Sequence, residues 1–532
     1  MRSVVRGGVA ICLLGLAACG SSGEFASFVG AEAKVVLLGS EVFADQELYY
    51  EAIDLKQGRM DTELGDARVD EDALSELLLR LHPEAFARIA HLTDAQIREQ
   101  RAVLIGEGTT DALESLSDVA PAGEGSQRGE LQEADSPFTW AAVCQTVNWI
   151  DAQPNNEYRI DFAVHTGDAV DVGLRSELAH FVYGAYRLDV PFLVAAGNHD
   201  ISTFGLWREG FTFNGLPLDT VIDDDEVDPV VFDGNQETLI QGRENFARQF
   251  RALVDADSAF AQTATSVALA SDYFGLDSAH PLSPPLEENR LYYTHEILAP
   301  APQDGTPGLQ VIVLETNIDD GSFEAEMDPQ QLQWLGNVLD DARTRQNLVV
   351  LSAHHPPMKV SREDDNRGTI SEVVVPPAMV QVRRMCSHYP NVVLFLCGHT
   401  HKPQICEWRD TFTDTDVSHG SGVDPGRIEW IQIDAGSILV APQESGIVEL
   451  VFDGDDILIH NNRFGAMIDE ASQLGQRVRA ARASALGDEQ SAPRYIPDRT
   501  YVGVLLDRLD VFRDGAGAWQ GVDVPRYDPS AP

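Results

Sequence analysis

The sequence predicts an α/β fold in which polar motifs lie at the ends of parallel strands. Five apolar runs of strand length recur along the chain, each followed by a short polar motif; the runs are RIAHLT, FAVHT, PFLVAA, LVVLSA and VVLFLC. Stretches with helical periodicity lie between most of these runs. Apolar strands that alternate with helices are typical of parallel sheets covered on both faces.

The five motifs contain residue types that bind metal ions. They are Asp94-Ala-Gln96, Gly167-Asp168-Ala-Val-Asp171, Gly197-Asn198-His199-Asp200, His354-His355-Pro-Pro357 and Gly398-His399-Thr-His401. Because ligands bind beyond the carboxyl ends of parallel strands, motifs that follow successive strands are expected to meet there. Mixed carboxylate, amide and imidazole donors predict a metal centre, and five motifs in order predict two ions.

The elements of the N-terminal half follow from periodicity and turn residues. We expect strands at 34–38, 86–92, 160–165 and 191–196, and helices at 72–81, 138–149 and 176–186. Residues 106–136 are rich in Gly, Ser, Glu and Asp, which predicts a surface insertion.

A long insertion, residues 201–290, follows the third motif and is expected to contain one helical stretch at 243–253. Loops of this length beside a binding strand usually shape a pocket. Further strands are expected at 291–295, 310–314, 348–352, 392–396, 428–433, 437–440, 446–452, 457–459 and 501–506. Asp328-Pro329 opens a helix with a core-facing stripe of Leu332, Leu335, Val338 and Leu339, and residues 465–485 predict another helix.

The charge balance restricts the partners of the protein. With 85 acidic and 38 basic residues, the formal net charge is −47. We expect no nucleic-acid binding, because that requires Lys and Arg to neutralise phosphates. An acidic face that keeps a secreted or salt-adapted protein soluble is the favoured explanation. Calcium sites in the acidic runs at 223–226 and 453–456 are the alternative, although neither run has the spacing of an EF-hand loop.

The N-terminus predicts export. Arg2 and Arg6 precede a short apolar stretch, Val9 to Leu16, which ends in Leu-Ala-Ala-Cys19-Gly. This stretch is shorter than the roughly 20 residues that span a bilayer. It resembles the lipobox of bacterial lipoproteins, which implies a signal peptide at 1–18, lipidation of Cys19 and attachment to a membrane outside the cytoplasm through that lipid alone. A simple cleaved signal with a chance cysteine is the alternative.

Four further cysteines lie in the remaining chain: Cys144, Cys386, Cys397 and Cys406. An oxidising compartment permits disulfides, and four cysteines allow three pairings, among which the sequence does not choose. A buried thiol is the more probable state of Cys397, since this residue lies on the strand before the fifth motif.

The ordered motifs resemble the calcineurin-like metallophosphoesterase superfamily over roughly Phe86 to Ile459. The resemblance implies a four-layer αββα sandwich with a small N-terminal extension and a β-rich C-terminal part. The expected boundaries are a tether and N-terminal extension at 19–85, a metallophosphoesterase domain at 86–460 and a C-terminal extension at 461–532.

The resemblance also implies a role for each motif residue. Asp94, Gln96, Asp168 and His401 would hold the first of two divalent or trivalent ions (Mn, Fe or Zn). Asp168 would bridge to the second ion, which Asn198, His354 and His399 complete. His199 would stabilise the transition state or protonate the leaving oxygen, and Asp200 could orient His199. Independently of the resemblance, Asp171 is either a further ligand or, as the favoured interpretation, the cap of the helix that follows it.

The implied reaction is hydrolysis of a phosphoric ester. Two ions lower the pKa of a bridging water, and the hydroxide so formed attacks phosphorus in line. A small phosphomonoester or phosphodiester is the expected substrate, with possible contacts from His355, Arg208 and Asn317.

One position departs from the common pattern, because many family members have histidine where this chain has Gln96. A neutral amide oxygen is a weaker donor than imidazole. This departure leaves open a non-catalytic surface binding module on a degenerate fold. A phosphoprotein phosphatase is a third reading, which the insertion at 201–290 would decide. The sequence does not specify an oligomeric state.

Overall fold

The structure is a computed structural model. It describes residues 34–37, 58–97, 102–105, 127–171, 173, 175–201, 212–213, 216–217, 230–232, 235–237, 243, 246–247, 250, 280–284, 290–301, 305–317, 325–358, 361–363, 370–372, 377–401, 403–409, 427–438, 443–486 and 500–509.

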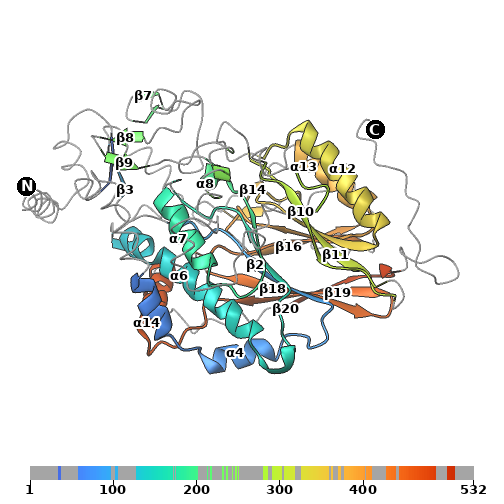
Figure 1. The fold of residues 1–532 in the computed structure, drawn as a ribbon, viewed down its shortest axis with the longest axis horizontal. Helices are drawn as coiled ribbons and strands as arrows, with labels where there is room; N and C mark the ends of the chain where they lie inside the picture. The colour runs from blue at the N-terminus through green and yellow to red at the C-terminus, as the bar shows by residue number, and fades with distance from the viewer. Residues whose placement is uncertain are drawn as a thin grey trace, which may run out of the picture.

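Two six-stranded sheets form the centre of the molecule (Figure 1). The first has the order β20-β19-β18-β2-β4-β5, and the second has the order β10-β11-β12-β15-β17-β16. The strands of the first sheet are β2 (Ala87–Leu92), β4 (Phe162–Thr166), β5 (Phe192–Ala195), β18 (Ser445–Asp453), β19 (Asp456–Phe464) and β20 (Thr500–Leu505). Those of the second are β10 (Tyr293–Leu298), β11 (Gly308–Val313), β12 (Asn347–Ser352), β15 (Val392–Cys397), β16 (Gln404–Arg409) and β17 (Ile428–Asp434).

Parallel pairing brings the motif-bearing strands together. In the first sheet β2 pairs with β4 and β4 with β5 in parallel. In the second sheet β11, β12, β15 and β17 are parallel neighbours. The flanking strands β10, β16, β18, β19 and β20 pair in antiparallel fashion. Four short antiparallel pairs complete the described strands: β1 (Lys34–Leu37) with β3 (Ala102–Ile105), β6 (Thr212–Phe213) with β7 (Leu216–Pro217), β8 (Val230–Phe232) with β9 (Asn235–Glu237), and β13 (Ser361–Glu363) with β14 (Ile370–Glu372).

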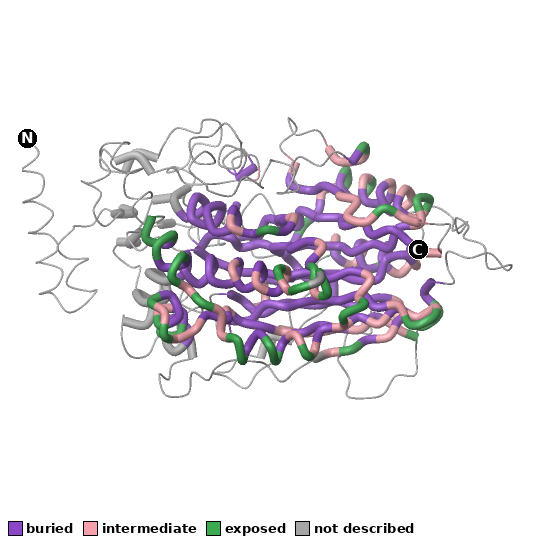
Figure 2. The backbone as a smooth tube through the Cα atoms, turned by 60° about the horizontal axis from the view of Figure 1, so that its bottom comes forward, coloured by how far each residue is buried: buried purple, intermediate pink, exposed green. Residues whose placement is uncertain are grey.

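Each central strand is buried on both faces, which explains the continuous apolar runs. On β12, Leu348 and Val350 belong to the core between the two sheets, whereas Val349 and Leu351 belong to the core under the outer helices. Figure 2 shows the buried strands running through the middle of the molecule, with exposed residues towards its periphery.

Helices cover the outer face of each sheet. The core that includes β2 and β4 residues takes in α4 (Glu71–Leu78), α6 (Gln127–Asp151) and α7 (Arg175–Ala185), and α14 (Gln473–Leu486) packs against α6. The second sheet packs against α12 (Pro329–Thr344) and α13 (Pro377–His388), which lie on the opposite side of the molecule in Figure 1. Two short helices, η3 (Pro154–Asn156) and α8 (Asn198–Ile201), complete the labelled elements. The predicted four-layer αββα sandwich is therefore confirmed.

Local signals placed the start of α12 correctly. The Asp328 side chain accepts a hydrogen bond from the Gln331 backbone N–H at 2.7 Å, and Pro329 occupies the first turn. Leu335, Val338 and Leu339 are buried as predicted, while Leu332 is half-buried.

Several expected elements differ from the structure. Residues 437 and 438 of the predicted strand 437–440 form no strand, and β16 was not predicted. α6 begins at Gln127, within the expected insertion 106–136, and α14 begins eight residues later than the predicted helix 465–485. Of the helix expected at 243–253, the described residues Arg243, Phe246, Ala247 and Phe250 are helical.

The domain boundaries near residues 86 and 460 remain predictions. The first sheet continues past the boundary near residue 460: β19 runs to Phe464, and β20, further along the chain, forms an edge of the same sheet. Among the described residues, no helix is long and apolar enough to span a bilayer. The signal segment and Cys19 lie outside the described residues.

The four cysteines considered for disulfides are all buried free thiols: Cys144, Cys386, Cys397 and Cys406. Burial raises the pKa of each of these thiols. None of the three possible pairings is formed, and the expectation of a buried thiol at Cys397 is confirmed.

Candidate metal centre

The loops that follow β2, β4, β5, β12 and β15 meet at one place. Backbone hydrogen bonds join them in pairs: Asp94 N–H donates to Gly167 O at 3.0 Å, and Gln96 N–H donates to Asp168 O at 2.9 Å. Gly398 N–H likewise donates to His354 O at 3.0 Å. The motifs are thus fixed to one another through their main chains before any ligand side chain is considered.

Five of the predicted ligands have positive φ, which L-residues seldom adopt. The residues and values are Asp94 (49°), Gln96 (39°), Asp168 (56°), His399 (72°) and His401 (55°). Such a conformation costs free energy, of the order of 1–3 kcal/mol per residue, and persists only where the surroundings enforce it. This backbone resolves how His399 and His401, two positions apart, can each serve a different ion.

Two motif glycines are required by close approach. A Cβ at Gly197 would lie 2.1 Å from Asp168 Oδ1, and a Cβ at Gly398 would lie 2.0 Å from Thr93 Oγ1 and 2.6 Å from Asp94 Oδ2. Any larger residue would displace a ligand carboxylate. The glycines of the third and fifth motifs therefore serve packing against Asp168 and Asp94.

The first group of donors consists of Asp94, Gln96, Asp168 and His401. Asp94, Asp168 and His401 place ligand atoms within 4.8 Å of one another. Asp94 Oδ1 lies 3.2 Å from His401 Nε2, and Gln96 Nε2 lies 3.3 Å from the same nitrogen. Gln96 Oε1 is buried and has no hydrogen-bond partner among the described residues, while the buried Asp94 Oδ1 faces the His401 imidazole. Buried oxygens without a partner are what a cation would satisfy.

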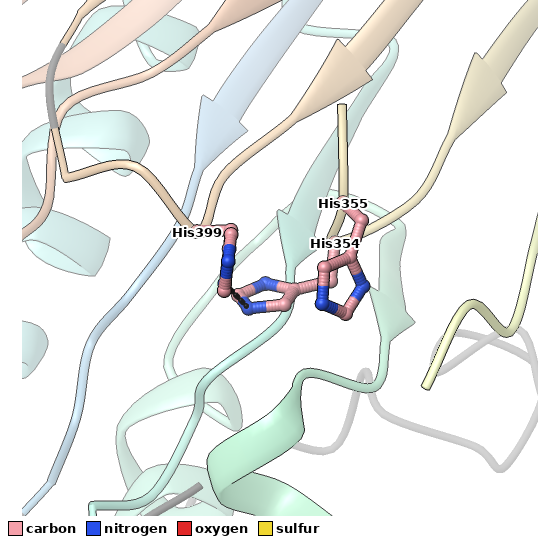
Figure 3. A group of neighbouring side chains, drawn as sticks. All are labelled: His354, His355 and His399. Atoms are coloured by element: carbon pink, nitrogen blue, oxygen red, sulfur yellow. Dashed lines mark hydrogen bonds between the residues drawn. The ribbon is translucent and has the colours of Figure 1, made fainter. Parts of the chain in front are cut away.

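The second group consists of Asp168, Asn198, His354 and His399. His354 Nε2 lies 2.9 Å from Asn198 Oδ1, 3.2 Å from His399 Nδ1 and 3.4 Å from Asp168 Oδ2. His399 Nδ1 lies 3.2 Å from Asn198 Oδ1. Figure 3 shows the rings of His354, His355 and His399 gathered together. Asp168 is close to members of both groups, as a bridging carboxylate must be.

The tautomer of His354 suits a ligand. Its Nδ1 lies 2.9 Å from Thr166 O, and a carbonyl can only accept, so Nδ1 carries the proton. Nε2 is therefore the nitrogen that faces the second group and that would bind an ion once its proton is displaced. Thr166 ends β4, and this outer contact is the type that orients metal-bound histidines.

The electrostatics of the site favour positive charge. Burial raises the pKa of the Asp94 and Asp168 carboxyls, but neighbouring histidines, chiefly His401 and His354 respectively, hold both below their usual range. Burial lowers the pKa of His354, yet Asp168 and Asp94 raise it to about 9. Burial and the His354 charge lower the pKa of His399 to about 3. Two buried carboxylates thus attract a cation, and metal binding would displace protons.

His199 is held by Asp171 and not by Asp200. His199 Nδ1 lies 2.8 Å from Asp171 O and 3.3 Å from Asp171 Oδ1. The Asp200 carboxylate instead accepts from Gly197 N–H at 2.8 Å and Val170 N–H at 3.1 Å. Burial and the Asp168 charge raise the pKa of Asp200 to about 7. Asp200 was predicted to orient His199, but the structure gives that contact to Asp171. The Asp200 carboxylate instead joins the loops of the second and third motifs by accepting from their backbone amides.

The expected substrate contacts are placed unequally. His355 lies beside the metal ligands, with ring centroids 5.0 Å from His354 and 4.5 Å from His399, and its Nδ1 lies 2.9 Å from Thr316 Oγ1. Asn317 is fully buried and donates to Ala196 O at 2.8 Å and to Glu315 Oε1 at 2.6 Å. Its hydrogen bond to Ala196 O holds the loop before Asn198. Asn317 is therefore buried inside the protein and is not placed as the expected substrate contact. Arg208 lies outside the described residues.

The donor spacings fit metal ions. Ligand atoms about 2.0–2.1 Å from one ion at tetrahedral angles lie roughly 3.3 Å apart, and the separations within the second group are 2.9, 3.2 and 3.2 Å. The first group is richer in oxygen and the second in nitrogen. Such donors suit Mn, Fe or Zn.

Sequence reasoning missed several supporting residues, which include Thr166, Thr316, Asp434 and Ser437. Thr166 directly precedes the second motif, whereas Thr316, Asp434 and Ser437 lie far from every motif in sequence and contact one only through the fold. Asp171 could have been recognised, since it belongs to the second motif.

A match to a protein family agrees with this geometry. The sequence profile of the family described as calcineurin-like phosphoesterase matches residues 87–403. Among solved structures, a dimetal phosphatase from Danio rerio matches with 13% identity and a TM-score of 0.35, over 72% of this chain and 97% of that one. A phosphopantetheinyl hydrolase from Mycobacterium tuberculosis matches with 11% identity and a TM-score of 0.24, over 67% of this chain and 91% of that one. No curated protein matches.

The family match spans more than half of the chain and includes all five motifs, whose side chains the fold brings together as two groups of metal-binding donors. The protein belongs to the calcineurin-like phosphoesterase family and is a metal-dependent phosphoric ester hydrolase.

Proposed function

We propose that the protein hydrolyses a small phosphomonoester or phosphodiester at a two-ion centre. The observation that carries this proposal is the position of Asp168, which clusters with Asp94 and His401 and whose Oδ2 also lies 3.4 Å from His354 Nε2, beside the cluster of His354, His355 and His399. Asp94, Gln96, Asp168 and His401 would hold the first ion, and Asp168, Asn198, His354 and His399 the second. The bound ions would supply an acidified water as nucleophile and would neutralise charge on the phosphoryl group.

The protein's own residues orient the reacting groups. The backbone N–H of His199 donates to Asp168 Oδ1 at 3.0 Å, which places this histidine beside the shared carboxylate. In the His199 ring, Nδ1 donates to Asp171 O, which fixes the orientation of the imidazole. Nε2 of His199 is then left for proton exchange with the leaving oxygen of the substrate. His355, held by Thr316 next to His354, is the described residue best placed to touch a phosphate oxygen.

The test is turnover of bis-p-nitrophenyl phosphate and p-nitrophenyl phosphate by the purified protein with Mn²⁺. We expect metal-dependent turnover of at least one ester and a loss of about 10²–10⁴-fold in kcat in His199→Ala, the usual contribution of a general acid. His388→Ala, on α13 in the outer helical layer, is the matched control and should retain turnover. Two bound ions without any turnover would instead support a non-catalytic binding module.

We further propose attachment to a membrane outside the cytoplasm through a lipid on Cys19. The support is the sequence Leu16-Ala17-Ala18-Cys19-Gly20 after a short apolar stretch. Metabolic labelling with palmitate in a bacterial host should mark the wild-type chain and not Cys19→Ser. Equal labelling of both would exclude this site.

A further inference from the structure

A loop that contributes no ligand contacts two of the metal-binding motifs. Residues 434–438 comprise the last residue of β17 and the loop after it, and the side chains of Asp434 and Ser437 are buried. β17 pairs in parallel with β15, so that Asp434 lies opposite Cys397, the residue before Gly398. Ala435 N–H donates to Cys397 O at 3.2 Å, which joins the loop to the start of the fifth motif.

Asp434 holds the turn between two ligands. Thr400 Oγ1 donates to Asp434 Oδ2 at 2.5 Å. Thr400 lies between His399 and His401, both of which have positive φ. A hydroxyl anchored between two strained residues limits how far the turn can relax. Because the turn supplies one imidazole to each donor group, this contact bears on both ions.

Ser437 holds the first motif. Its Oγ donates to Asp94 O at 2.9 Å, and Ile438 N–H donates to Thr93 O at 3.2 Å. Asp94 is also strained, with φ of 49°, and belongs only to the first donor group. This contact therefore bears on the first ion and not directly on the second.

We infer that residues 434–438 form a positioning loop for the metal centre, in which Asp434 acts on both ions through Thr400 and Ser437 acts on the first ion through Asp94. None of these side chains binds an ion or touches substrate. This role rests on the proposed two-ion function. Contacts of this outer type commonly change metal affinity about 10–100-fold.

Thr400→Val tests the positioning loop without replacing the buried Asp434 itself, because valine keeps the shape of threonine and removes only the hydroxyl that donates to Asp434. Titration of the purified protein with Co²⁺, followed by its visible spectrum and by calorimetry, resolves two binding steps. We expect Thr400→Val to weaken both steps about 10–100-fold. Thr400→Ser keeps the hydroxyl and should bind like the wild type. Ser437→Ala should weaken one step and spare the other.

The outcomes separate this inference from the proposed function. If the wild type binds two ions and Thr400→Val binds them with unchanged affinity, the positioning loop is wrong and the two-ion centre stands. Equal weakening in Thr400→Val and Thr400→Ser would also overturn it, since the hydroxyl would then not matter. A wild type that binds no ion would overturn both proposals. Thermal unfolding of each variant without metal measures the loss of stability that follows when the buried Asp434 carboxylate loses its donor, and so separates that loss from the change in metal affinity.

Discussion

At the scale of single residues, Gln96 has the strongest influence on the character of the first donor group. Its amide lies 3.3 Å from His401 Nε2, and its Oε1 is buried without a hydrogen-bond partner among the described residues. With glutamine in place of histidine, the first group has a single imidazole beside oxygen donors. Oxygen donors favour harder ions, whereas the imidazole-rich second group favours Zn or Fe.

Gln96→His should tighten the first ion roughly tenfold or more, because imidazole is the stronger donor to these metals. Competition with a chelator measures the affinity of each site. Gln473→His, at the exposed start of α14, is the matched control, because it makes the same substitution away from the metal centre. Unchanged metal retention in Gln96→His would mean that Gln96 is no ligand.

At the scale of elements, a buried ion pair connects β2 to β18. Arg88 Nε lies 2.8 Å from Glu449 Oε1, and both side chains are almost inaccessible to solvent. Arg88 also donates to His82 O at 2.6 Å and Arg159 O at 3.0 Å. The ion pair therefore joins β2 and β18 to the loops that contain His82 and Arg159. Arg88 lies near the start of β2, whereas the metal-binding motif follows the end of that strand.

Arg88→Ala should lower the free energy of unfolding by about 3–5 kcal/mol, because it leaves Glu449 buried and unpaired. Burial already raises the pKa of Glu449 and Arg88 opposes this, so the variant carboxyl would have a still higher pKa when folded. A raised folded pKa lowers stability as pH rises, so the loss should be larger at pH 8 than at pH 5. Denaturant titration at both pH values measures this.

Arg479→Ala is the matched control for that measurement. Arg479 pairs with Glu470 on the exposed side of α14, and exposed pairs contribute about 0–1 kcal/mol. Equal losses in the two arginine variants would contradict the stabilising role of the buried pair.

At the scale of the whole molecule, the net charge of −47 dominates. Repulsion among excess carboxylates opposes the compact state and is screened by salt. Raising NaCl from about 0.02 M to about 0.5 M should therefore raise the midpoint of thermal unfolding by several degrees. Calorimetry checks this, and an unchanged midpoint would mean that the acidic groups are too far apart to interact.

The same measurement bears on the calcium alternative. The acidic run at 453–456 forms the hairpin between β18 and β19, where Asp456 Oδ1 accepts from Asp507 N–H at 2.7 Å. If charge screening alone acts, CaCl₂ and NaCl of equal ionic strength stabilise equally. Additional stabilisation by calcium would favour a site among these carboxylates.

The sequence by itself predicted a layered α/β fold and the place where the motifs meet. Runs such as VVLFLC are apolar on both faces, so only strands inside a layered fold can bury them. Polar residues directly after such strands must meet at one edge of parallel sheets. The order of the motifs thus predicted that their side chains gather at one place, and the resemblance to the calcineurin-like family supplied their division around Asp168.

Only the tertiary structure decided how those side chains are held. The choice of Asp171 over Asp200 as the partner of His199 depends on which way two loops turn, and neighbouring acidic residues look alike in sequence. Residues 437–438 form a loop beneath Asp94 instead of a strand, because their hydrogen bonds go to Thr93 and Asp94, more than 340 residues earlier. Contacts over such separations leave no local pattern, since propensity and periodicity describe only neighbours along the chain.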